Sequence, residues 1–443
     1  MKLSTQPYKG ARDFYPEDKR LQNYIFSTWR RIVESYGYEE YDAPILELTE
    51  IYAAKSGEEI VDQQTYRFED RGGRDVAIRP EMTPTVSRMI AGRRQEIAYP
   101  ARWYSIPNLW RYERPQRGRL REHWQLNVDI FGVSTVDAEL ELIMVANDIM
   151  KAFGAKTDMY TIKINSRKLT ALIMAEYLEL DSAQSHLMVK LLDRKDKIPT
   201  DTFDAEASSI FGGSHVDAGL AKLKMLIGAK SMAELPQEIL DNDHVRQIQI
   251  LFTHLKENGI ANAVFDVALM RGFDYYTDIV FEVYDSNPEN NRSMFGGGRY
   301  DGLVGMFGVD PIATAGFGMG DVTMQSFLEV HGLVPDLKST TDVYLIPVGD
   351  TLRQVQGMAK IMREEGVNVA VEVNDRKLDK QIKTADKSSI RYVMFVGEDE
   401  LGKEQFKLKD LDSGDETDVS LERAISLVTD HRLRDEDVDS RIA

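Results

Sequence analysis

Apolar residues recur at helical spacing near the start of the chain. Leu21, Ile25 and Trp29 lie four residues apart, and the pattern continues to Tyr36. Because apolar positions three or four residues apart share one face of a helix, this run predicts an amphipathic helix. Gly37 follows directly, as is typical of a helix end.

Strand-like segments follow this helix. They cover residues 76–79, 102–111, 124–131 and 160–164. Ser134 and Asp137 form a capping-box pattern, which predicts the start of a helix that runs to about Phe153. The first part of the chain therefore mixes strands with helices.

Residues from about 167 to 258 have a different character. They are mostly helical in pattern, and strand-like runs resume at 263–269 and 276–284. A helical block between strands predicts an inserted subdomain. From Asp342 onward, strand-like segments alternate with helical ones, which predicts a small α/β domain with a largely parallel sheet.

These changes predict the domain organisation. The acidic C-terminal tail has no apolar period and is expected to fray. The predicted parts are a core at 1–166 and 259–333, a helical insertion at 167–258, an α/β domain at 340–430 and a tail at 431–443.

Composition narrows the chemistry. The chain has 443 residues and no cysteine, which excludes disulfides, thiol catalysis and cysteine-bound metals. Its seven histidines show no HxH or HExxH spacing, so the sequence indicates no metal site built from protein side chains. The net charge of -18 argues against general affinity for nucleic acids, although a local basic patch stays open.

The sequence also bears on location. The N-terminus has no apolar signal region, and the chain has no run of about 18 apolar residues. We therefore expect a soluble cytoplasmic protein that does not span a membrane.

One stretch is rich in arginine. Between Trp110 and Gln125, only two carboxylates accompany arginines at positions 111, 114, 117, 119 and 121. Pro115 and Gly118 between strand-like flanks predict a hairpin, and we name its connection, residues 111–121, the arginine loop. Arginine suits phosphate because its planar fork donates two parallel hydrogen bonds. A solvated basic loop is the alternative.

The glycine-rich segments do not match a common nucleotide-binding loop. There is no GxxxxGK[ST], and the glycines at 296–298 and 316–320 miss the GxGxxG spacing. A nucleotide would therefore be bound without a P-loop or a Rossmann fingerprint.

The order of residue types around the arginine loop resembles motif 2 of class II aminoacyl-tRNA synthetases, in the form found in the histidyl-tRNA synthetase family. Four further segments are similar to that family in the expected order. They are Tyr41–Glu47 (motif 1), Arg79–Thr83 (RPEMT), Arg271–Tyr276 (RGFDYY) and Gly297–Gly302 (GGRYDG). The C-terminal region resembles the family's anticodon-binding domain, so the likeness spans about residues 7 to 425.

The resemblance implies a fold and a reaction. The fold is an α+β class II catalytic core, an antiparallel sheet with flanking helices, plus a helical insertion and a C-terminal α/β anticodon-binding domain. A homodimer is implied because Pro44 of motif 1 lies at the dimer interface in this class. The implied reaction joins L-histidine to ATP as histidyl-adenylate and then transfers histidine to the 3′-terminal adenosine of tRNA(His). Mg²⁺ is expected with ATP, because the pyrophosphate leaving group carries several charges.

The resemblance also assigns the nucleotide site. By matching, Arg111 holds the α-phosphate, Glu113 the adenine amine and Arg119 the far phosphates. Arg271 lies between the amino acid carboxylate and the α-phosphate, so Arg271 and Arg111 are the implied catalytic residues. In-line attack at phosphorus builds charge on the equatorial oxygens, and fixed cations there lower the barrier.

The same matching implies a histidine site. Glu81, Thr83 and Gln125 surround the α-amino group, and Asp129 and Tyr276 lie near the imidazole. A carboxylate that accepts a ring N–H rejects side chains without that donor. For Asp129, a salt-bridged strand residue is the alternative.

Two neighbouring features leave more than one interpretation. Tyr275 and Tyr276 are consecutive on a predicted strand, so we expect one to face the substrate and the other the core. The glycines at 296–298 form either a plain loop or a backbone that approaches a ligand closely. Tyr300, which follows them, is open to a packing role instead of a binding one.

Two basic segments are candidate tRNA contacts. Arg114 and Gln116 match residues that contact the 5′ end of tRNA in bacterial relatives. A second set recurs along one side of a predicted C-terminal helix and consists of Arg376, Lys377, Lys380 and Lys383, followed by Lys387. A solvated helix is the alternative for that set.

Three positions depart from the family. Thr323 stands where motif 3 has an arginine that grips the ATP phosphates, which removes a contact worth about 1.5–3 kcal/mol. His123 replaces a phenylalanine that stacks on adenine, and Trp124 replaces a histidine for which the sequence offers no reason. His123 and Thr323 are still expected at the ATP site. Thr323→Arg should tighten ATP binding unless another cation already fills that place.

The departures raise an alternative function. Some paralogues of this family are catalytically silent and act as regulatory subunits of ATP phosphoribosyltransferase. They generally lack the anticodon-binding domain and erode the RGLDYY signature, whereas this chain keeps Glu81, Gln125, Arg271 and the C-terminal domain. Glycyl, prolyl and threonyl synthetases share that domain, but not RGFDYY together with GGRYDG. The sequence therefore favours the histidine-ligating enzyme.

Overall fold

The structure, a computed structural model, describes residues 3–53, 64–195, 198–213, 216–229, 231–269, 275–290, 292–374 and 376–441. The chain forms two compact units. Unit 1 comprises Met1–Asp13 and Tyr24–Leu333, and unit 2 comprises Phe14–Asn23 and Val334–Ala443.

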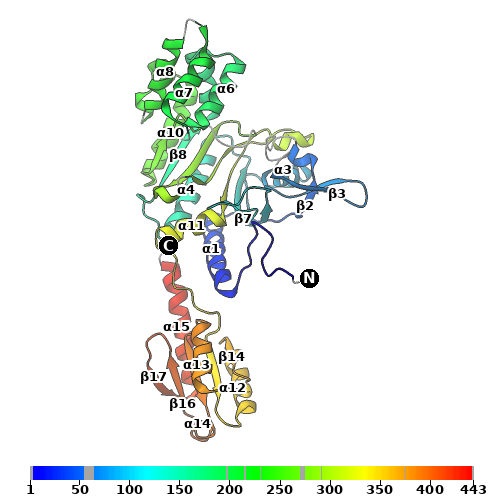
Figure 1. Cartoon of the computed structure of the whole chain (residues 1–443), viewed down its shortest axis with the longest axis vertical. Helices are drawn as coiled ribbons and strands as arrows, with labels where there is room; N and C mark the ends of the chain where they lie inside the picture. Colours follow the sequence, from blue (N-terminus) through cyan, green and yellow to red (C-terminus); the bar gives the residue numbers. More distant parts are fainter. Residues whose placement is uncertain are drawn as a thin grey trace. The chain divides into compact units, whose positions relative to one another are not determined.

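Among the described residues, a nine-stranded sheet forms the frame of unit 1 (Figure 1). The strand order is β1-β5-β7-β12-β11-β10-β8-β9, and β6 pairs with β7 beside this path. The β1·β5 and β8·β9 pairs are parallel and the others antiparallel. The strands are β1 (Glu39–Glu40), β5 (Ala101–Ser105), β6 (Asn108–Trp110), β7 (Glu122–Phe131), β8 (Tyr160–Ser166), β9 (Ala263–Phe265), β10 (Ile279–Asp285), β11 (Ser293–Arg299) and β12 (Thr314–Gly320).

Further elements flank this sheet. A second, antiparallel sheet has the order β2-β4-β3. Its strands and the neighbouring helices are α1 (Pro16–Ser35), β2 (Leu46–Leu48), α2 (Glu50–Ala53), β3 (Tyr66–Glu69), β4 (Asp75–Ile78), α3 (Thr83–Gly92), α4 (Asp137–Ala152), two 3₁₀ turns (Pro288–Asn290 and Val304–Phe307) and α11 (Asp321–Val330). The predicted first helix is confirmed, but the predicted capping box is wrong. The N-cap of α4 is Val136, which has no side-chain acceptor, and Asp137 accepts a 2.6 Å bond from Thr135 Oγ1.

A helical block follows β8 in the sequence. Figure 1 shows α6, α7 and α8 gathered together, and α10 packs against α4, α5 and β8. Its elements are α5 (Arg167–Leu172), a π-helical turn (Ile173–Tyr177), α6 (Ser182–Asp193), α7 (Thr200–Phe211), α8 (Val216–Gly228), a 3₁₀ turn (Met232–Glu234), α9 (Gln237–Leu240) and α10 (Asp243–Glu257). The buried side chains of these helices share one core with Phe265 and Val267. The boundaries of an inserted subdomain at 167 and 258 stay a prediction.

Unit 2 contains a five-stranded sheet with the order β14-β13-β15-β16-β17 among its described residues. Only the β13·β14 and β13·β15 pairs are parallel, so the sheet is less parallel than predicted. The bounds are β13 (Val343–Pro347), α12 (Leu352–Glu364), β14 (Val369–Val371), α13 (Leu378–Lys387), β15 (Tyr392–Val396), α14 (Glu398–Lys403), β16 (Phe406–Asp410), β17 (Glu416–Val419) and α15 (Leu421–Arg441). Helix α15 continues to Arg441, and the frayed tail stays a prediction.

Both faces of the five-stranded sheet in unit 2 are covered. Val343 and Leu345 of β13 pack with α12 and α15, whereas Tyr344 and Ile346 pack with Ala385 of α13. Successive strand residues point to opposite faces, so one strand supplies both cores. The predicted fold class, an α+β core with a helical block and a C-terminal α/β part, is confirmed. Within the described ranges, no helix is long and apolar enough to cross a membrane.

Candidate active site

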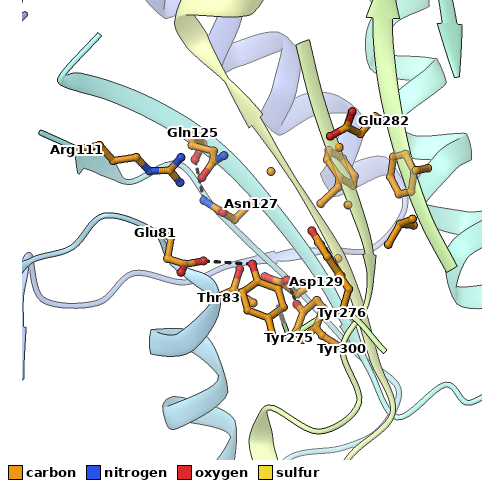
Figure 2. A pocket seen from close by; sticks show the side chains of 17 residues that line it. Glu81, Thr83, Arg111, Gln125, Asn127, Asp129, Tyr275, Tyr276, Glu282 and Tyr300 are labelled. Carbon is orange, nitrogen blue, oxygen red and sulfur yellow. Dashed lines mark hydrogen bonds between the residues drawn. The ribbon is translucent and has the colours of Figure 1, made fainter. Parts of the chain in front are cut away.

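A pocket of about 170 Å³ lies on the large sheet of unit 1 (Figure 2). Typical sites for drug-sized ligands measure about 300–1,000 Å³, so this one suits a molecule of amino-acid size. Six separate segments of the chain supply its walls. The lining residues are Glu81, Thr83, Arg111, Gln125, Asn127, Asp129, Tyr275, Tyr276, Val280, Phe281, Glu282, Gly296, Gly297, Tyr300, Gly316, Phe317 and Gly318.

Strand β7 supplies one wall of the pocket. Leu126 and Val128 are fully buried in the core, so Gln125, Asn127 and Asp129 share the opposite face of the strand. All three line the pocket. The alternation of residue types along β7 therefore builds a polar row in the middle of the sheet.

Glycines on β12 make room for that polar row. A Cβ atom at Gly316 would lie 2.2 Å from Asp129 Oδ1, and one at Gly318 would lie 2.6 Å from Gln125 Nε2. Any side chain at these positions would therefore displace the polar groups of β7. The glycines at 296–298 lie in strand β11 and not in a loop, so the plain-loop interpretation is wrong. Gly296 and Gly297 line the pocket, and a close approach to a ligand there stays a prediction.

The buried end of the pocket is acidic. We name Glu81, Asp129, Tyr275, Tyr276 and Tyr300 the acidic end. Tyr300 Oη donates a hydrogen bond to Asp129 Oδ1. Among the described residues, Asp129 Oδ2 is buried without a hydrogen-bond partner. Burial raises the pKa of Asp129 to about 7, and the bond from Tyr300 offsets part of that rise.

Both consecutive tyrosines line the pocket, so the expectation that only one would face it is wrong. Tyr275 lies in a turn and not in a strand, and its ring centroid is 5.0 Å from that of Tyr276. Tyr275 Oη donates to Glu81 Oε2 over 3.2 Å (Figure 2). Burial and the charge of Glu81 raise the pKa of Tyr275 well above its usual value, so its hydroxyl stays protonated.

The other end of the pocket carries positive charge. Among the described lining residues, Arg111 is the only cation, and its Nε donates to Pro80 O over 2.8 Å. Arg119 Nε pairs with Glu113 Oε2 at 2.9 Å. Glu113 is buried, whereas the Arg119 side chain is half-exposed. Neither Glu113 nor Arg119 lines the pocket itself.

His123 lies among arginines close to this end. Burial and the charges of Arg111, Arg12 and Arg119 lower the pKa of His123 to about 3. The imidazole is therefore neutral at physiological pH and can offer a flat, uncharged face. Among the described residues, its Nδ1 is buried without a hydrogen-bond partner. Its neighbour Trp124 packs toward Phe26.

Thr323 lies outside the pocket, in the first turn of α11. Its Oγ1 donates to the carbonyls of Met294 and Gly320, at 2.8 and 3.0 Å. In the same turn, buried Asp321 pairs with Arg12 at 2.7 Å. A guanidinium group is thus held beside the position where the sequence lacks one.

The arginine loop forms the predicted hairpin. Arg111 N donates to Arg121 O, and Gln116 pairs with Arg119 across the turn. At the tip, Arg117 Nη1 donates to Glu289 Oε2 over 2.9 Å. Arg114 is exposed, and Gln116 accepts a bond from Arg292. These two predicted tRNA contacts therefore lie on the surface.

The predicted basic side in unit 2 is also exposed. Lys377 is the N-cap of α13, and Lys380 and Lys383 lie on the exposed side of that helix. Arg376 differs, because it pairs with buried Glu372. Arg271 falls outside the described residues.

Three polar pocket residues were not predicted from the sequence as ligand contacts. Asn127 lies between two predicted residues at the strand period, so alternation alone could have indicated it. Glu282 reaches the pocket from β10, and Tyr300 comes from the segment after β11. Nothing local in the sequence marks Glu282, since its role depends on which strands are neighbours.

Comparisons with known proteins agree with this arrangement. A family model described as histidyl-tRNA synthetase matches residues 10–320, and one described as an anticodon binding domain matches residues 342–431. The chain is 43% identical over 431 residues to the histidine–tRNA ligase of Leptospira biflexa, covering 96% of this chain and 98% of that protein.

Solved structures share the fold. The crystal structure of histidyl-tRNA synthetase from Nostoc sp. PCC 7120 has a TM-score of 0.83 at 23% identity, covering 97% of this chain and 100% of that one. A Bacillus halodurans structure described as an ATP phosphoribosyltransferase regulatory subunit/histidyl-tRNA synthetase has a TM-score of 0.73 at 20% identity, covering 90% of this chain and 99% of that one. At these identities, the likeness concerns the fold alone.

Proposed function

The chain belongs to the histidyl-tRNA synthetase family, and from that premise we propose how its own residues perform the reaction. It is a class II aminoacyl-tRNA synthetase and ligates histidine to tRNA(His). L-Histidine and ATP give histidyl-adenylate and pyrophosphate, and histidine then passes to the 3′-terminal adenosine of the tRNA. The proposals below concern residue roles, Mg²⁺, subunit assembly and tRNA contacts.

We propose that histidine binds with its side chain in the acidic end. The observation that carries this proposal is the enclosure of one unpartnered carboxylate oxygen, Asp129 Oδ2, in a pocket of amino-acid size. Ionised Asp129 accepts the imidazole N–H. Glu81, Thr83 and Gln125 hold the α-ammonium group, and Tyr275 fixes Glu81 in place through the bond of its hydroxyl.

The α-phosphate of ATP is assigned to Arg111. A histidine carboxylate oxygen attacks the α-phosphorus while the bond to pyrophosphate breaks, and the guanidinium stabilises charge on the equatorial oxygens. Arg119 is assigned to the far phosphates, Glu113 to the adenine amine, and the neutral His123 ring to stacking on adenine. Arg271 keeps its sequence-based assignment between carboxylate and phosphate.

Mg²⁺ is proposed to accompany ATP. This ion usually binds through phosphates and one or two carboxylates and keeps several waters. Glu282 lines the pocket and has no role in the histidine assignment, so its carboxylate would hold the ion. The ion would neutralise charge on the leaving pyrophosphate.

Arg111→Ala tests the nucleotide assignment. We expect histidine-dependent ATP–pyrophosphate exchange to fall about 10²–10³-fold, as for other donors aimed at developing negative charge. Arg93→Ala is the matched control, because Arg93 is exposed and pairs only with its neighbour Glu96 among the described residues. Equal activities of the two variants would refute the assignment.

A homodimer is proposed from an exposed apolar surface on the β2-β4-β3 sheet. Leu46, Leu48 and Phe68 are 48%, 42% and 48% exposed, and Ile45 precedes them at 52%. Such gatherings of apolar side chains mark protein interfaces. Leu46→Glu should shift the protein to monomer in sedimentation velocity, whereas Leu187→Glu, on the exposed side of α6, should not. A monomeric unmodified protein would refute this proposal.

The basic side of α13 is proposed to contact tRNA phosphates near the anticodon. Lys380→Glu with Lys383→Glu should weaken tRNA(His) binding about tenfold and lower its salt dependence by about two charges. Lys360→Glu, an exposed lysine on α12 of the same unit, is the control. Unchanged affinity for tRNA(His) in the double variant would show that the basic side of α13 faces solvent and does not contact the tRNA.

The regulatory alternative gains no support from these residues. The Bacillus halodurans structure is similar only in fold, and this chain includes both the pocket carboxylates and the C-terminal domain. A cytoplasmic location stays a prediction.

A further inference from the structure

An exposed group of aromatic side chains surrounds Arg121 at the base of the arginine loop. The Arg121 guanidinium carbon lies 4.0 Å from the ring centroid of Tyr112 and 5.6 Å from that of Tyr8. Arg121 Nη1 also donates to Tyr8 Oη over 3.0 Å. We name Tyr8, Tyr66, Trp110, Tyr112 and Arg121 the aromatic platform.

Three separate segments build this platform. Tyr66 of β3 meets Trp110 and Tyr112 edge to face, with ring centroids 5.9 and 5.5 Å apart. Tyr8 lies 6.5 Å from Trp110 by ring centroids, and its hydroxyl accepts a 3.4 Å bond from Tyr66 Oη. The backbone fixes the N-terminal segment as well, because Arg121 N and Glu122 N both donate to Gly10 O.

The platform is open to solvent at its outer members. Tyr8 is 53% exposed and Tyr112 is 52% exposed. Core packing does not account for two tyrosines held against a guanidinium while half of their surface meets water. Aromatic rings and arginine planes arranged in this way are the surfaces on which unpaired nucleobases stack.

The position of the platform indicates the ligand. Arg111, which lines the pocket, donates its backbone N–H to Arg121 O over 2.8 Å, so the platform begins one residue from the pocket wall. The 3′-terminal adenosine of tRNA must reach this pocket for the second step of the reaction. Arg114 and Arg117 on the same loop add positive charge for the RNA backbone.

We propose that the aromatic platform stacks an unpaired nucleobase at the acceptor end of the tRNA. The base would lie on the exposed face of Tyr112 or Tyr8, with Arg121 holding both rings in place. Stacking tolerates any base, so the platform would guide the strand and leave sequence selection to other contacts. The proposal rests on the proposed function, which places the reacting adenosine in the pocket beside it.

Tyr112→Ala and Tyr8→Ala test the proposal. We expect the KM for tRNA(His) in aminoacylation to rise about tenfold, which is about 1.4 kcal/mol. Histidine-dependent ATP–pyrophosphate exchange needs no tRNA and should stay within about threefold of the unmodified enzyme. Tyr15→Ala is the matched control, because Tyr15 is 64% exposed and lies outside the platform. Tyr112→Phe should retain a normal KM, since it keeps the ring.

The origin of the base is distinguished with short acceptor-stem hairpins. One hairpin lacks the 3′ single strand and another lacks the unpaired 5′ nucleotide. If the platform contacts the 3′ strand, the hairpin without that strand should bind Tyr112→Ala and the unmodified enzyme equally well. If the platform contacts the 5′ nucleotide, the same should hold for the hairpin without that nucleotide. Because stacking involves no phosphate, the salt dependence of binding should be the same in Tyr112→Ala and the unmodified enzyme.

Several results would overturn the proposal. An unchanged KM for tRNA in both alanine variants would do so, as would a Tyr112→Phe variant as weak as Tyr112→Ala. Dissociation of the protein into smaller species in Tyr112→Ala would assign the platform to a subunit contact instead. Normal exchange in these variants would leave the proposed function standing in each case.

Discussion

The acidic end of the pocket and the arginine loop hold their charged groups in opposite ways. At the acidic end, Asp129 is buried, held by one hydroxyl, and left with an oxygen that has no partner among the described residues. On the loop, Arg117 and Arg119 are half-exposed and already paired with carboxylates.

This difference has a physical consequence. Asp129 Oδ2 has no hydrogen-bond partner among the described residues, so a ligand that donates to it displaces no protein group. A phosphate at the arginine loop must compete with Glu113 and Glu289 for the guanidinium groups. The change at Asp129 should therefore have the largest effect, whereas changes at Arg117 and Arg119, which are already paired with carboxylates, should have smaller effects.

Asp129→Asn should have the largest effect. The amide cannot act as a charged acceptor for the imidazole N–H, so kcat/KM for histidine in exchange should fall about 10³-fold or more. The KM for ATP should stay nearly constant, because Asp129 lies away from the loop. A fall in kcat/KM for histidine of less than about tenfold would contradict the larger effect expected at the acidic end than at the arginine loop.

Tyr300→Phe should shift the pH dependence of histidine use. The pKa of Asp129 is raised to about 7, so the carboxylate is present above that pH and is lost as the pH falls below it. In the unmodified enzyme, kcat/KM for histidine should therefore decline below about pH 7. The Tyr300 hydroxyl stabilises the charged form, so its removal should move the decline to higher pH and cost about tenfold at pH 7. A profile that does not move would show that another group controls it.

Arg119→Ala should raise the KM for ATP by less than about tenfold. A charge-assisted hydrogen bond is worth about 1.5–3 kcal/mol when nothing replaces it. Arg111 and Arg12 lie close enough to lower the pKa of His123 together with Arg119. Their positive charges should therefore still attract the ATP phosphates when Arg119 is removed. Arg117→Ala, at the exposed loop tip, is the control and should leave the KM for ATP unchanged. A rise in the KM for ATP above about a hundredfold would show that the other cations do not replace Arg119.

Thr323→Arg should have the smallest effect, below about threefold in the KM for ATP. Arg12 is already fixed by Asp321 in the same turn of α11. A Cβ atom at Gly118 would lie 3.7 Å from the Thr323 methyl group, so the loop tip occupies part of the space that a longer side chain needs. Measurement of the KM for ATP in exchange decides this point. A decrease of tenfold would show that the missing arginine matters and that Arg12 does not replace it.

The sequence predicted the fold class and most of the pocket for identifiable reasons. The resemblance to the family around the arginine loop pointed to Arg111, Gln125 and Asp129, and all three line the pocket. What it could not predict depends on contacts between distant segments. Tyr300 follows β11 and reaches Asp129 of β7 across β12, where Gly316 leaves room for both side chains.

One wrong prediction and one contact that the sequence did not indicate have the same origin. Tyr275 and Tyr276 were assigned to opposite sides because a strand was assumed, but Tyr275 lies in a turn that brings both rings into the pocket. The ion pair of Arg12 with Asp321, two residues before Thr323, joins positions 309 residues apart in the sequence, and no local pattern marks such a pair. The arginine loop was easier to recognise than to interpret, since its ion pairs with Glu113 and Glu289 are visible only in the fold.

Amino-acid-dependent ATP–pyrophosphate exchange with each of the twenty amino acids tests the central claim most directly. Histidine alone should support exchange, because its imidazole combines a ring N–H donor for Asp129 with a size that suits the pocket of about 170 Å³. Exchange with a different amino acid would contradict the account of the pocket. No exchange with any amino acid, in a folded protein that still binds ATP, would contradict the claim that the protein activates an amino acid and would favour a regulatory role.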